Sequence, residues 1–482
     1  NISLNSRLMK GRDLFVPVIG ERVDAHRFIL QAISNGAVCS FTSRHKSLED
    51  FKKDFGEKES GFICDEAFSE NSEKKGKKSH SLTHSFALIS VDDTVAALQA
   101  LGAYYRDNYV KTPFVGVTGS VGKTTTREMI ASALSAGFRV YATKGNSNSQ
   151  VGVPITVTET DSDAQIGVIE LGMSEFGEMT RISNVAKPDT AVITNIGISH
   201  INQLKTRENI LIQKLHITDG MRSVGVLILN GDDEYLKDID EKKLHEYGIA
   251  EDKELKLLFY GTGEKCDFRA QDIVLKDGYP EFTIVDTHTG ESARKRLSVM
   301  GDHMILNAVA SVCAASVYGI KIEDSFSALS GFTGVKGRGE IYKVSGMTII
   351  DDSYNAAPDS MKAGLKVLWD MPCGNRKKAV LADMLELGEK ETEYHREVGE
   401  FMAQNGILPD ELLLLGNLSE NIAKGLTENL SSREKTPSIK HFSELSELMD
   451  YLKASLKSGD TVLFKGSNSM GLSKAVKELL ED

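Results

Sequence analysis

The stretch TGSVGKTTT, residues 118–126, decides the fold of the region around it. It reads as a phosphate-binding loop, but the usual G-x-x-x-x-G-K-[ST] spacing would put a glycine at position 117, where Val117 stands. Glycines occur instead at Gly116, Gly119 and Gly122. The apolar run FVGV precedes the turn and the helical pattern TTREMIASAL follows it, which is the context that such a loop requires.

This turn predicts a site for nucleotide phosphates. Its backbone N–H groups and the positive end of the following helix would face phosphate oxygens. Lys123 would reach the outer phosphates, and Thr124 would contact a magnesium ion. The residues that we expect to bind the nucleotide here are Gly119, Ser120, Gly122, Lys123, Thr124 and Thr125.

Outward from the loop, apolar runs alternate with helical patterns in two series. FVGV, QIGVIE, TAVITNIG and VGVLILN predict a parallel sheet built from strand–helix–strand units. After Gly331 the pattern restarts with MTIIDDSY, KKAVLADM, DELLLLG and TVLFKG, which predicts a second α/β domain of the Rossmann-like kind.

The part of the chain that precedes the phosphate loop reads differently. Short apolar groups from Leu14 to about Ile33 indicate a small mixed α/β domain, and a helical pattern through Val95, Leu98 and Tyr105 leads into the phosphate loop. We therefore expect an α/β protein with three domains, whose predicted ranges are residues 1–88, 89–333 and 334–482.

Composition narrows the class of partner. The net charge of −12 argues against a nucleic-acid binder and favours small anionic ligands held in a local positive pocket. The longest apolar runs fall short of the roughly 18 residues of a membrane span. Five scattered cysteines without a C-x-x-C pair indicate neither a disulfide framework nor a zinc site, so we expect a reducing cytoplasm. We also expect a monomer. The lysine-rich segment 69–85 is expected to be a surface loop, and Asn1 suggests a trimmed N-terminus.

Two polar residues follow apolar runs of the first series. Glu170 ends IGVIE, where a magnesium-binding carboxylate is expected, and His200 ends AVITNIGISH. Taken alone, Glu170 also fits an ordinary acid at a strand end, and His200 fits a loop histidine with a structural role. Together with the phosphate loop after FVGV, these two residues would make three groups at successive strand ends, which would converge on one edge of a sheet.

Lys214 lies in ENILIQKLHI on the same helical face as Ile210, Leu211 and Ile217. A lysine at such a position commonly lays its stem along apolar surface and keeps its charge in water. A buried amine instead has a lowered pKa, and a neutral lysine can add carbon dioxide to form an anionic carbamate. Spacing alone leaves both interpretations open.

Seven motifs occur in an order that resembles the Mur ligases of peptidoglycan synthesis. They are GSVGKTTT, IELGMSEFGE, TNIGISHI, ENILIQKLHI, IIDDSYNAAPDSM, LADMLELGE and LFKGSNSMGL. The resemblance runs from SLNSR near the start to KGSNSMGL near the end, and the short glycine spacing of the phosphate loop is itself typical of the family. It implies an ATP-dependent amide ligase that phosphorylates a carboxylate, with UDP-N-acetylmuramoyl-tripeptide and D-alanyl-D-alanine as the substrates that its motifs favour.

The same resemblance implies two magnesium ions. Thr124 and Glu170 would bind the first ion, and Glu170 and His200 the second, with Lys214 carbamylated beside it. These ions would help Lys123 to draw two mutually repelling anions, the γ-phosphate and the carboxylate, together.

Other site residues are likewise implied by matching positions in the family. For the nucleotide they are Asn307, Arg338 and Asp352. For the muramoyl-peptide substrate they are Ser6, Arg7, Asn148 and Ser199. For the incoming amine they are Tyr354, Asn355, Asp383 and Ser467. The chain departs from the family pattern at Ser149, Met304, Ala357 and Ala382, which leaves the exact amino-acid substrate more open than the reaction class.

Three alternatives remain at this stage. A folylpolyglutamate-synthetase-like ligase is disfavoured by DDSYNAAPDSM and by the N-terminal domain. A nucleotide switch would hydrolyse ATP slowly without any amine, and a scaffold without catalysis is disfavoured by the intact Lys123, Thr124, Glu170 and His200. Hinges are expected near the phosphate loop and near residue 333.

Overall fold

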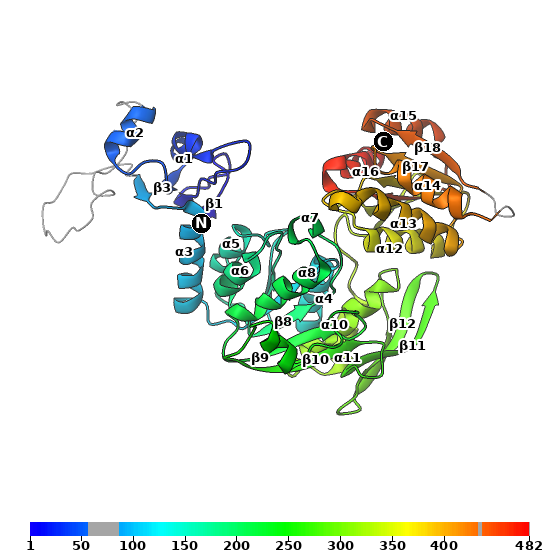
Figure 1. Cartoon of the computed structure of the whole chain (residues 1–482), viewed down its shortest axis with the longest axis horizontal. Helices are drawn as coiled ribbons and strands as arrows, with labels where there is room; N and C mark the ends of the chain where they lie inside the picture. The colour runs from blue at the N-terminus through cyan, green and yellow to red at the C-terminus, as the bar shows by residue number, and fades with distance from the viewer. Residues whose placement is uncertain (56–85, 432–435, 482) are drawn as a thin grey trace, which may run out of the picture. The chain divides into compact units, whose positions relative to one another are not determined.

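The computed structural model describes residues 1–55, 86–431 and 436–481. Within these residues the strands form three sheets, which we call the N-terminal, central and C-terminal sheets (Figure 1). The predicted α/β class, with a small N-terminal part, a central parallel-sheet part and a Rossmann-like C-terminal part, is confirmed. The expected surface loop at residues 69–85 and Cys64 lie outside the described residues.

The N-terminal sheet is entirely parallel, in the order β1-β2-β3-β4. The strands and helices of this region are β1 (Ile2–Ser3), β2 (Asp13–Phe15), η1 (Ala25–Phe28), α1 (Ile29–Ser34), β3 (Ala37–Thr42), α2 (Leu48–Phe55), β4 (Ala87–Ser90) and α3 (Thr94–Asn108). The helix expected from Val95, Leu98 and Tyr105 is α3, and Asp93 caps it by accepting the backbone N–H groups of Val95 and Ala96. Residues 1–111 form one compact unit with residues 147–162 and 184–186, and the rest of the chain forms a second unit.

The central sheet has the order β13-β12-β11-β10-β9-β8-β5-β7-β6. Its strands are β5 (Phe114–Thr118), β6 (Val140–Ala142), β7 (Ile166–Glu170), β8 (Thr190–Ile193), β9 (Val224–Asn230), β10 (Glu254–Gly261), β11 (Phe268–Lys276), β12 (Tyr279–Asp286) and β13 (Ser292–Arg296). The helices between and after them are α4 (Lys123–Leu134), α5 (Gly152–Thr158), α6 (Glu178–Ala186), α7 (Ile201–Leu204), α8 (Arg207–Leu215), η4 (His216–Gly220), α9 (Glu241–Glu246), α10 (His303–Val317) and α11 (Ile322–Ser330). β5 pairs in parallel with β7 on one side and β8 on the other. The phosphate loop therefore leaves β5 where the strand order reverses, which is where open α/β sheets bind ligands.

Burial explains why β5 lies inside the central sheet. Val115 and Val117 of β5 share a core with Met129 and Ile130 of α4 and with Val309 of α10. Every residue of β5 is buried, as expected for a strand that is covered on both faces. The apolar core thus fixes the carboxyl end of β5 and the start of α4, between which the phosphate loop lies.

The C-terminal sheet has the order β14-β15-β19-β16-β17-β18 and is parallel except for β14. Its elements are β14 (Glu340–Val344), β15 (Met347–Asp352), α12 (Pro358–Asp370), β16 (Lys377–Ala382), η5 (Gly388–Lys390), α13 (Glu391–Gln404), β17 (Glu411–Leu415), α14 (Glu420–Asn429), β18 (Ser438–Phe442), α15 (Leu445–Ser455), β19 (Thr461–Lys465), η6 (Asn468–Met470) and α16 (Leu472–Glu481). Along β17 the side chains alternate: Leu412 and Leu414 join the core that includes Leu365 and Val398, and Leu413 joins the opposite core. This two-sided burial accounts for the uninterrupted run DELLLLG.

The apolar runs predicted most of the parallel strands. Runs of the first series correspond to β5, β7, β8 and β9, and runs of the second to β15, β16, β17 and β19. The segment from β10 to β13 was not predicted, because its strands carry many charged and exposed residues. The expected domain boundaries stay predictions, and β4 spans the first of them.

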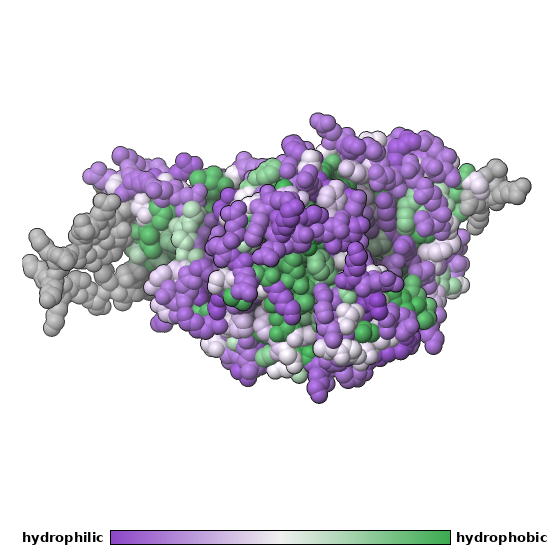
Figure 2. Space-filling view, turned by 60° about the horizontal axis from the view of Figure 1, so that its bottom comes forward, coloured by the Kyte–Doolittle hydropathy of each residue, from purple (hydrophilic) through white to green (hydrophobic). Residues whose placement is uncertain are grey.

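The surface in Figure 2 is largely hydrophilic, with smaller groups of hydrophobic residues between the polar ones. No described helix combines the length and the apolar character that a membrane crossing needs. The four cysteines in the described part of the chain, Cys39, Cys266, Cys313 and Cys373, are free thiols.

Candidate functional site

The phosphate loop is shaped by its glycines and held by a neighbouring turn. Gly122 adopts a φ of 82° immediately before α4, a conformation that L side chains rarely adopt. A Cβ at Gly119 would lie 1.8 Å from Oγ1 of Thr194, so only glycine fits there. Oδ1 of Asn195 accepts the backbone N–H groups of Ser120 and Val121 at 3.1 and 2.9 Å. The close approach of Thr194 and the positive φ therefore explain the glycines at positions 119 and 122.

Lys123 begins α4 and folds back over the loop. Its Nζ donates to the carbonyl oxygens of Gly119 at 2.7 Å and Ser120 at 3.3 Å. Burial lowers the pKa of Lys123, the nearby Glu170 carboxylate raises it and Arg338 lowers it further. The ammonium is thus held by backbone carbonyls, a set of partners that an anionic ligand could replace.

Glu170 ends β7 and is buried beside α4. Its Oε1 accepts the hydroxyl of Thr124 at 3.2 Å, and its backbone N–H donates to Oγ1 of Thr143 at 3.0 Å. The structure therefore brings together the hydroxyl and the carboxylate that the sequence assigned to one metal ion. Both are hard oxygen donors of the kind that Mg²⁺ prefers.

Arg127 is a site residue that the sequence analysis missed. It is buried one turn after Thr124 on α4, and its Nη1 lies 3.1 Å from Oε2 of Glu170. The same nitrogen donates to the carbonyl oxygen of Gly145 at 2.8 Å. An arginine in a helix is usually predicted to be exposed. Arg127, however, follows Thr124 by three residues and therefore lies on the same helical face, which is the sequence signal that could have identified it. Arg127 fixes the orientation of the Glu170 carboxylate.

His200 does not end a strand, and that expectation was wrong. β8 stops at Ile193, and the side chains of the next two residues, Thr194 and Asn195, both donate to the carbonyl oxygen of Val121 in the phosphate loop. His200 instead caps α7 in a left-handed conformation with a φ of 63°. Its Nδ1 lies 3.2 Å from Oε2 of Glu386, although the angle is not that of a hydrogen bond. Burial first, then the charges of Lys123 and Lys214, lower the pKa of His200 to about 4, so the ring is neutral and able to act as a metal ligand.

Lys214 lies on α8 and is only 2% exposed. This low exposure contradicts the interpretation in which its charge stays in water. Its ammonium makes no hydrogen bond or ion pair with any described residue. Burial and then the charge of Lys123 hold the pKa of Lys214 well below its ordinary value. A buried amine without a partner favours the neutral form, which is the form that reacts with carbon dioxide.

The described residues contain no group of three or more His, Cys, Asp or Glu side chains arranged to hold a metal ion. The predicted set is of another composition, because it includes the hydroxyl of Thr124 and a modified Lys214. The oxygen donors of Thr124 and Glu170, together with the unpaired amine of Lys214, are compatible with magnesium and a carbamate.

The predicted nucleotide residues occupy two places. Thr125 is buried in the first turn of α4, and Oδ1 of Asn307 accepts the hydroxyl of Thr126 at 3.1 Å, which places α10 beside the loop. Asp352 ends β15 and accepts Nζ of Lys465 at 2.6 Å. Arg338 lies 4.2 Å above the ring of Tyr354.

The residues assigned to the incoming amine follow the carboxyl ends of strands in the C-terminal sheet. Tyr354 and Asn355 follow β15, Asp383 follows β16 and Ser467 follows β19. Asp383 accepts the backbone N–H of Ser419 at 2.7 Å, and Oγ of Ser467 accepts that of Leu385 at 2.9 Å. Asp383 and Ser467 thus already shape the loops at this edge.

The residues assigned to the muramoyl-peptide substrate are divided between the two units. Ser199 donates to the carbonyl oxygen of Ser120 at 3.2 Å, so it adjoins the phosphate loop. In the other unit, Oγ of Ser6 donates to Oε1 of Gln31 at 2.6 Å, and Arg7 is exposed. Asn148 is half-buried in that same unit.

Comparison with known proteins supports one family over the whole chain. The descriptions "Mur ligase family, catalytic domain", "Mur ligase middle domain" and "Mur ligase, glutamate ligase domain" match residues 1–106, 117–315 and 337–468. A relative from Bacillus subtilis (strain 168), named UDP-N-acetylmuramoyl-tripeptide–D-alanyl-D-alanine ligase, is 34% identical, and the match covers 100% of this chain and 93% of the relative.

Solved structures of similar proteins have the same architecture. The crystal structure of MurF from Acinetobacter baumannii has a TM-score of 0.79 at 28% identity, covering 100% of this chain and 93% of that one. MurF ligase from Thermotoga maritima, solved in complex with ADP, has a TM-score of 0.76 at 26% identity, covering 100% of this chain and 97% of that one.

Proposed function

The chain belongs to the Mur ligase family, and from that premise we propose that it joins D-alanyl-D-alanine to UDP-N-acetylmuramoyl-tripeptide in an ATP-dependent ligation. The observation that carries this proposal is the full-length match to a ligase named for those two substrates. Among the site residues, the contact between Thr124 and Glu170 beside Lys123 supports ATP as the phosphoryl donor.

The reaction that we propose has two steps. A carboxylate oxygen of the tripeptide attacks the γ-phosphorus of ATP, the bond to the β-phosphate oxygen breaks, and an acyl phosphate and ADP form. The amine nitrogen of D-alanyl-D-alanine then attacks the acyl carbon, inorganic phosphate leaves and the nitrogen loses a proton. Lys123 and the N–H groups of the phosphate loop would stabilise the anionic oxygens in the first step.

Magnesium would supply positive charge between the phosphates and the carboxylate. Thr124 and Glu170 would hold one ion, and Glu170, His200 and a carbamylated Lys214 would hold a second. The carbamate forms when the neutral amine nitrogen of Lys214 adds to the carbon of CO₂ and loses a proton. This modification would turn a buried neutral amine into an anion beside a metal ion.

The remaining roles are proposals of the same kind. Residues 1–88, 89–333 and 334–482 would act as the domains for the uridine substrate, ATP and the amine, with hinges near the phosphate loop and near residue 333. Asn307, Arg338 and Asp352 would contact the nucleotide. Muramoyl-peptide contacts fall to Ser6, Arg7, Asn148 and Ser199, and amine contacts to Tyr354, Asn355, Asp383 and Ser467. We also propose that the protein acts as a monomer in the cytoplasm, without nucleic acid.

Phosphate release tests the proposed function. The full chain is supplied with MgATP, UDP-N-acetylmuramoyl-tripeptide and D-alanyl-D-alanine, and each substrate is then omitted in turn. We expect ADP and phosphate only with both co-substrates, and a product whose mass equals that of the tripeptide plus the dipeptide less water. Turnover without the amine would support a nucleotide switch and overturn the proposal. Tripeptides with lysine or diaminopimelate at the third position, and glutamate as an alternative amine, define the specificity.

A further inference from the structure

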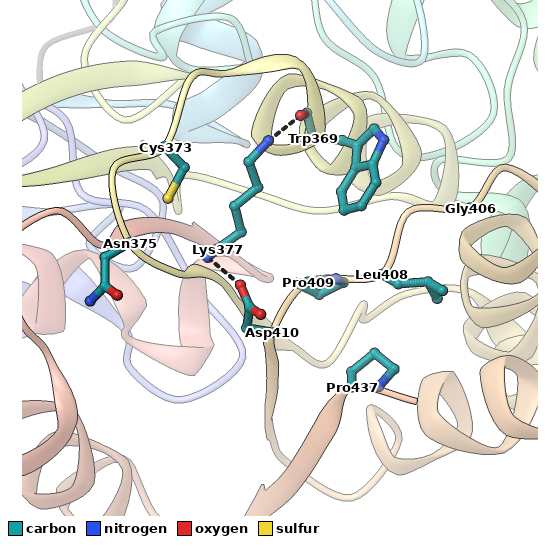
Figure 3. A pocket seen from close by; sticks show the side chains of 9 residues that line it. All are labelled: Trp369, Cys373, Asn375, Lys377, Gly406, Leu408, Pro409, Asp410 and Pro437. Atoms are coloured by element: carbon teal, nitrogen blue, oxygen red, sulfur yellow. Dashed lines mark hydrogen bonds between the residues drawn. The ribbon is translucent and has the colours of Figure 1, made fainter. Parts of the chain in front are cut away.

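A pocket of about 430 Å³ lies in the C-terminal domain, away from the residues of the ligase reaction (Figure 3). Its lining residues precede β16, β17 and β18 or begin them: Trp369, Cys373, Asn375, Lys377, Gly406, Leu408, Pro409, Asp410 and Pro437. In this sheet, the residues proposed to bind the incoming amine follow the carboxyl ends of β15, β16 and β19. Because these strands are parallel, the pocket lies at the opposite edge of the C-terminal sheet.

Apolar side chains form most of the pocket wall. Trp369, in the last turn of α12, is 39% exposed although it is the largest apolar side chain of the region. In Figure 3 its indole stands on one side of the pocket, with Leu408, Pro409 and Pro437 on the other. An exposed aromatic ring opposite two prolines is suited to a flat apolar group, and the volume falls within the range of small-ligand sites.

Among the described residues that line the pocket, Lys377 supplies the one ammonium group. Nζ of Lys377 donates to the carbonyl oxygen of Trp369 and lies 5.2 Å from the centre of its indole ring. Burial lowers the pKa of Lys377, whereas the thiol of Cys373 and the carboxylates of Asp370 and Asp410 raise it. An ammonium has three donors, so the bond to Trp369 leaves capacity for a ligand.

The acidic neighbours do not neutralise Lys377 directly. No described carboxylate lies within ion-pair distance of its Nζ. The carboxylate of Asp410 instead accepts the backbone N–H of Lys377 at 3.0 Å, as the dashed line in Figure 3 shows. The pocket therefore combines an apolar body site with one cation that lacks a carboxylate partner.

We propose that this pocket binds a small organic acid, whose carboxylate pairs with Lys377 and whose apolar or aromatic body packs between Trp369 and the two prolines. A partly desolvated ammonium favours an anion, and the apolar wall selects against inorganic anions, which have no body to bury. The same ammonium disfavours a cationic ligand of equal shape.

The sequence provides a direct reporter, because Trp369 is the only tryptophan of the chain. The full-length protein is titrated with 4-phenylbutyrate, 4-phenylbutanamide and 4-phenylbutylamine while tryptophan emission is recorded. These compounds share one body and differ in charge. We expect a saturable change with the carboxylate, a Kd at least about tenfold weaker for the amide and no binding of the amine. Equal responses to all three, or none, would overturn the proposal.

Two further measurements separate a ligand site from a lysine that only caps α12. Lys377→Gln keeps a donor for the carbonyl of Trp369, yet it should weaken the carboxylate at least about tenfold and leave the amide unchanged. Lys474→Gln, at an exposed lysine of α16, is the matched control. In the unmodified chain, 4-phenylbutyrate should slow alkylation of Cys373, followed by peptide mapping, and leave that of Cys39 unaltered. Unchanged carboxylate affinity in Lys377→Gln would mean that Lys377 has only a capping role.

Discussion

Two lysines, Lys214 beside the central sheet and Lys378 in the C-terminal sheet, are both buried but have opposite surroundings. Lys378 donates to Oε2 of Glu411 at 3.1 Å and to Oγ of Ser455 at 3.2 Å, and it lies 3.9 Å from Oδ2 of Asp460. Lys214 has no such partner among the described residues. Burying an ammonium is costly unless it is paired, so the fold accounts for Lys378 but not for Lys214.

The difference indicates which buried charges belong to the fold and which await a ligand. Lys378, Glu411 and Arg376 form a closed network at the amino ends of the strands. Near the phosphate loop, Lys123 instead donates to backbone carbonyl oxygens. The ammonium of Lys214 has no hydrogen-bond or ion-pair partner among the described residues. Substitutions in the two groups should therefore separate activity from stability.

The largest effect is expected at Lys123. Lys123→Met should lower kcat/KM by about 10⁴-fold, because it removes the ammonium proposed to bind the outer phosphates. Stability should not fall, since the ammonium donates only to carbonyl oxygens of its own loop. Phosphate release and thermal unfolding are measured together, with Lys242→Met, at an exposed lysine of α9, as the control. Activity within tenfold of the parent would contradict the assignment.

The reverse outcome is expected at Lys378. Lys378→Met should lower the free energy of unfolding by about 3–5 kcal/mol, because Glu411 and Asp460 are left buried with less positive charge. The kcat of the folded fraction should stay within a factor of about two, since the residue touches no proposed substrate. Urea denaturation followed by circular dichroism measures the change. If Lys378→Met were as stable as the parent but inactive, Lys378 would resemble a catalytic lysine and the proposed difference from Lys214 would be refuted.

Lys214 provides the third comparison. Lys214→Met should lower kcat by about 100-fold while leaving stability unchanged or higher, because an unpaired buried amine is removed. Lys214→Ala should recover part of its activity in formate or another short carboxylate, which would replace the carbamate. Formate should not affect the parent enzyme. Full activity of Lys214→Ala without any carboxylate would refute the proposed role.

Elements and site residues were predictable from the sequence where local burial or strand order determines their position. Strands buried on both faces, such as β5 and β17, are continuous apolar runs that the sequence displays directly. Thr124 and Glu170 could be expected to meet, because the carboxyl ends of β5 and β7 are neighbours in a parallel sheet.

Most of the features that could not be predicted depend on contacts between residues far apart in the sequence. Asn195 supports the phosphate loop through hydrogen bonds across 74 and 75 positions of sequence, so its place in the motif TNIGISHI did not predict these bonds. The network of Lys378 is equally non-local, since Glu411 and Asp460 come from other strands and loops. The antiparallel strands β11 to β13 were not predicted, because exposed charged residues interrupt their apolar pattern.

Arg127 should give a smaller effect than the lysines. Arg127→Gln should lower kcat/KM about tenfold, because Glu170 loses the donor that orients it. The variant should also bind free Mn²⁺ more tightly in the absence of nucleotide, as measured by electron paramagnetic resonance, since Glu170 no longer shares its charge with a guanidinium. Arg127→Lys should retain most activity, because one nitrogen of Arg127 makes the bonds to both Gly145 and Glu170. Unaltered metal affinity in Arg127→Gln would limit the residue to a packing role.

The smallest effect concerns His395, whose ring supports the loop after β16. Its Nε2 accepts the backbone N–H of Met384 at 2.9 Å, and Nδ1 pairs with the carbonyl oxygen of Glu391, so the neutral ring donates from Nδ1. Burial lowers the pKa of His395 below the ordinary value of 6.5, with the bond to Glu391 opposing the shift. Its contribution to stability is therefore complete above 6.5 and is lost as the pH falls towards the folded-state pKa, because a protonated Nε2 would face the N–H of Met384.

His395→Gln preserves both bonds without a titrating group, since an amide oxygen can accept from Met384 while its nitrogen donates to Glu391. Between neutral pH and pH 5 the parent should lose about 1 kcal/mol more unfolding free energy than this variant. His45 and His303 also have lowered pKa values from burial, so the variant should flatten the acid profile only in part. His245→Gln, at an exposed histidine, should follow the parent. Parallel profiles for the parent and His395→Gln would show that folding does not change the pKa of His395, and they would refute its proposed contribution to acid sensitivity.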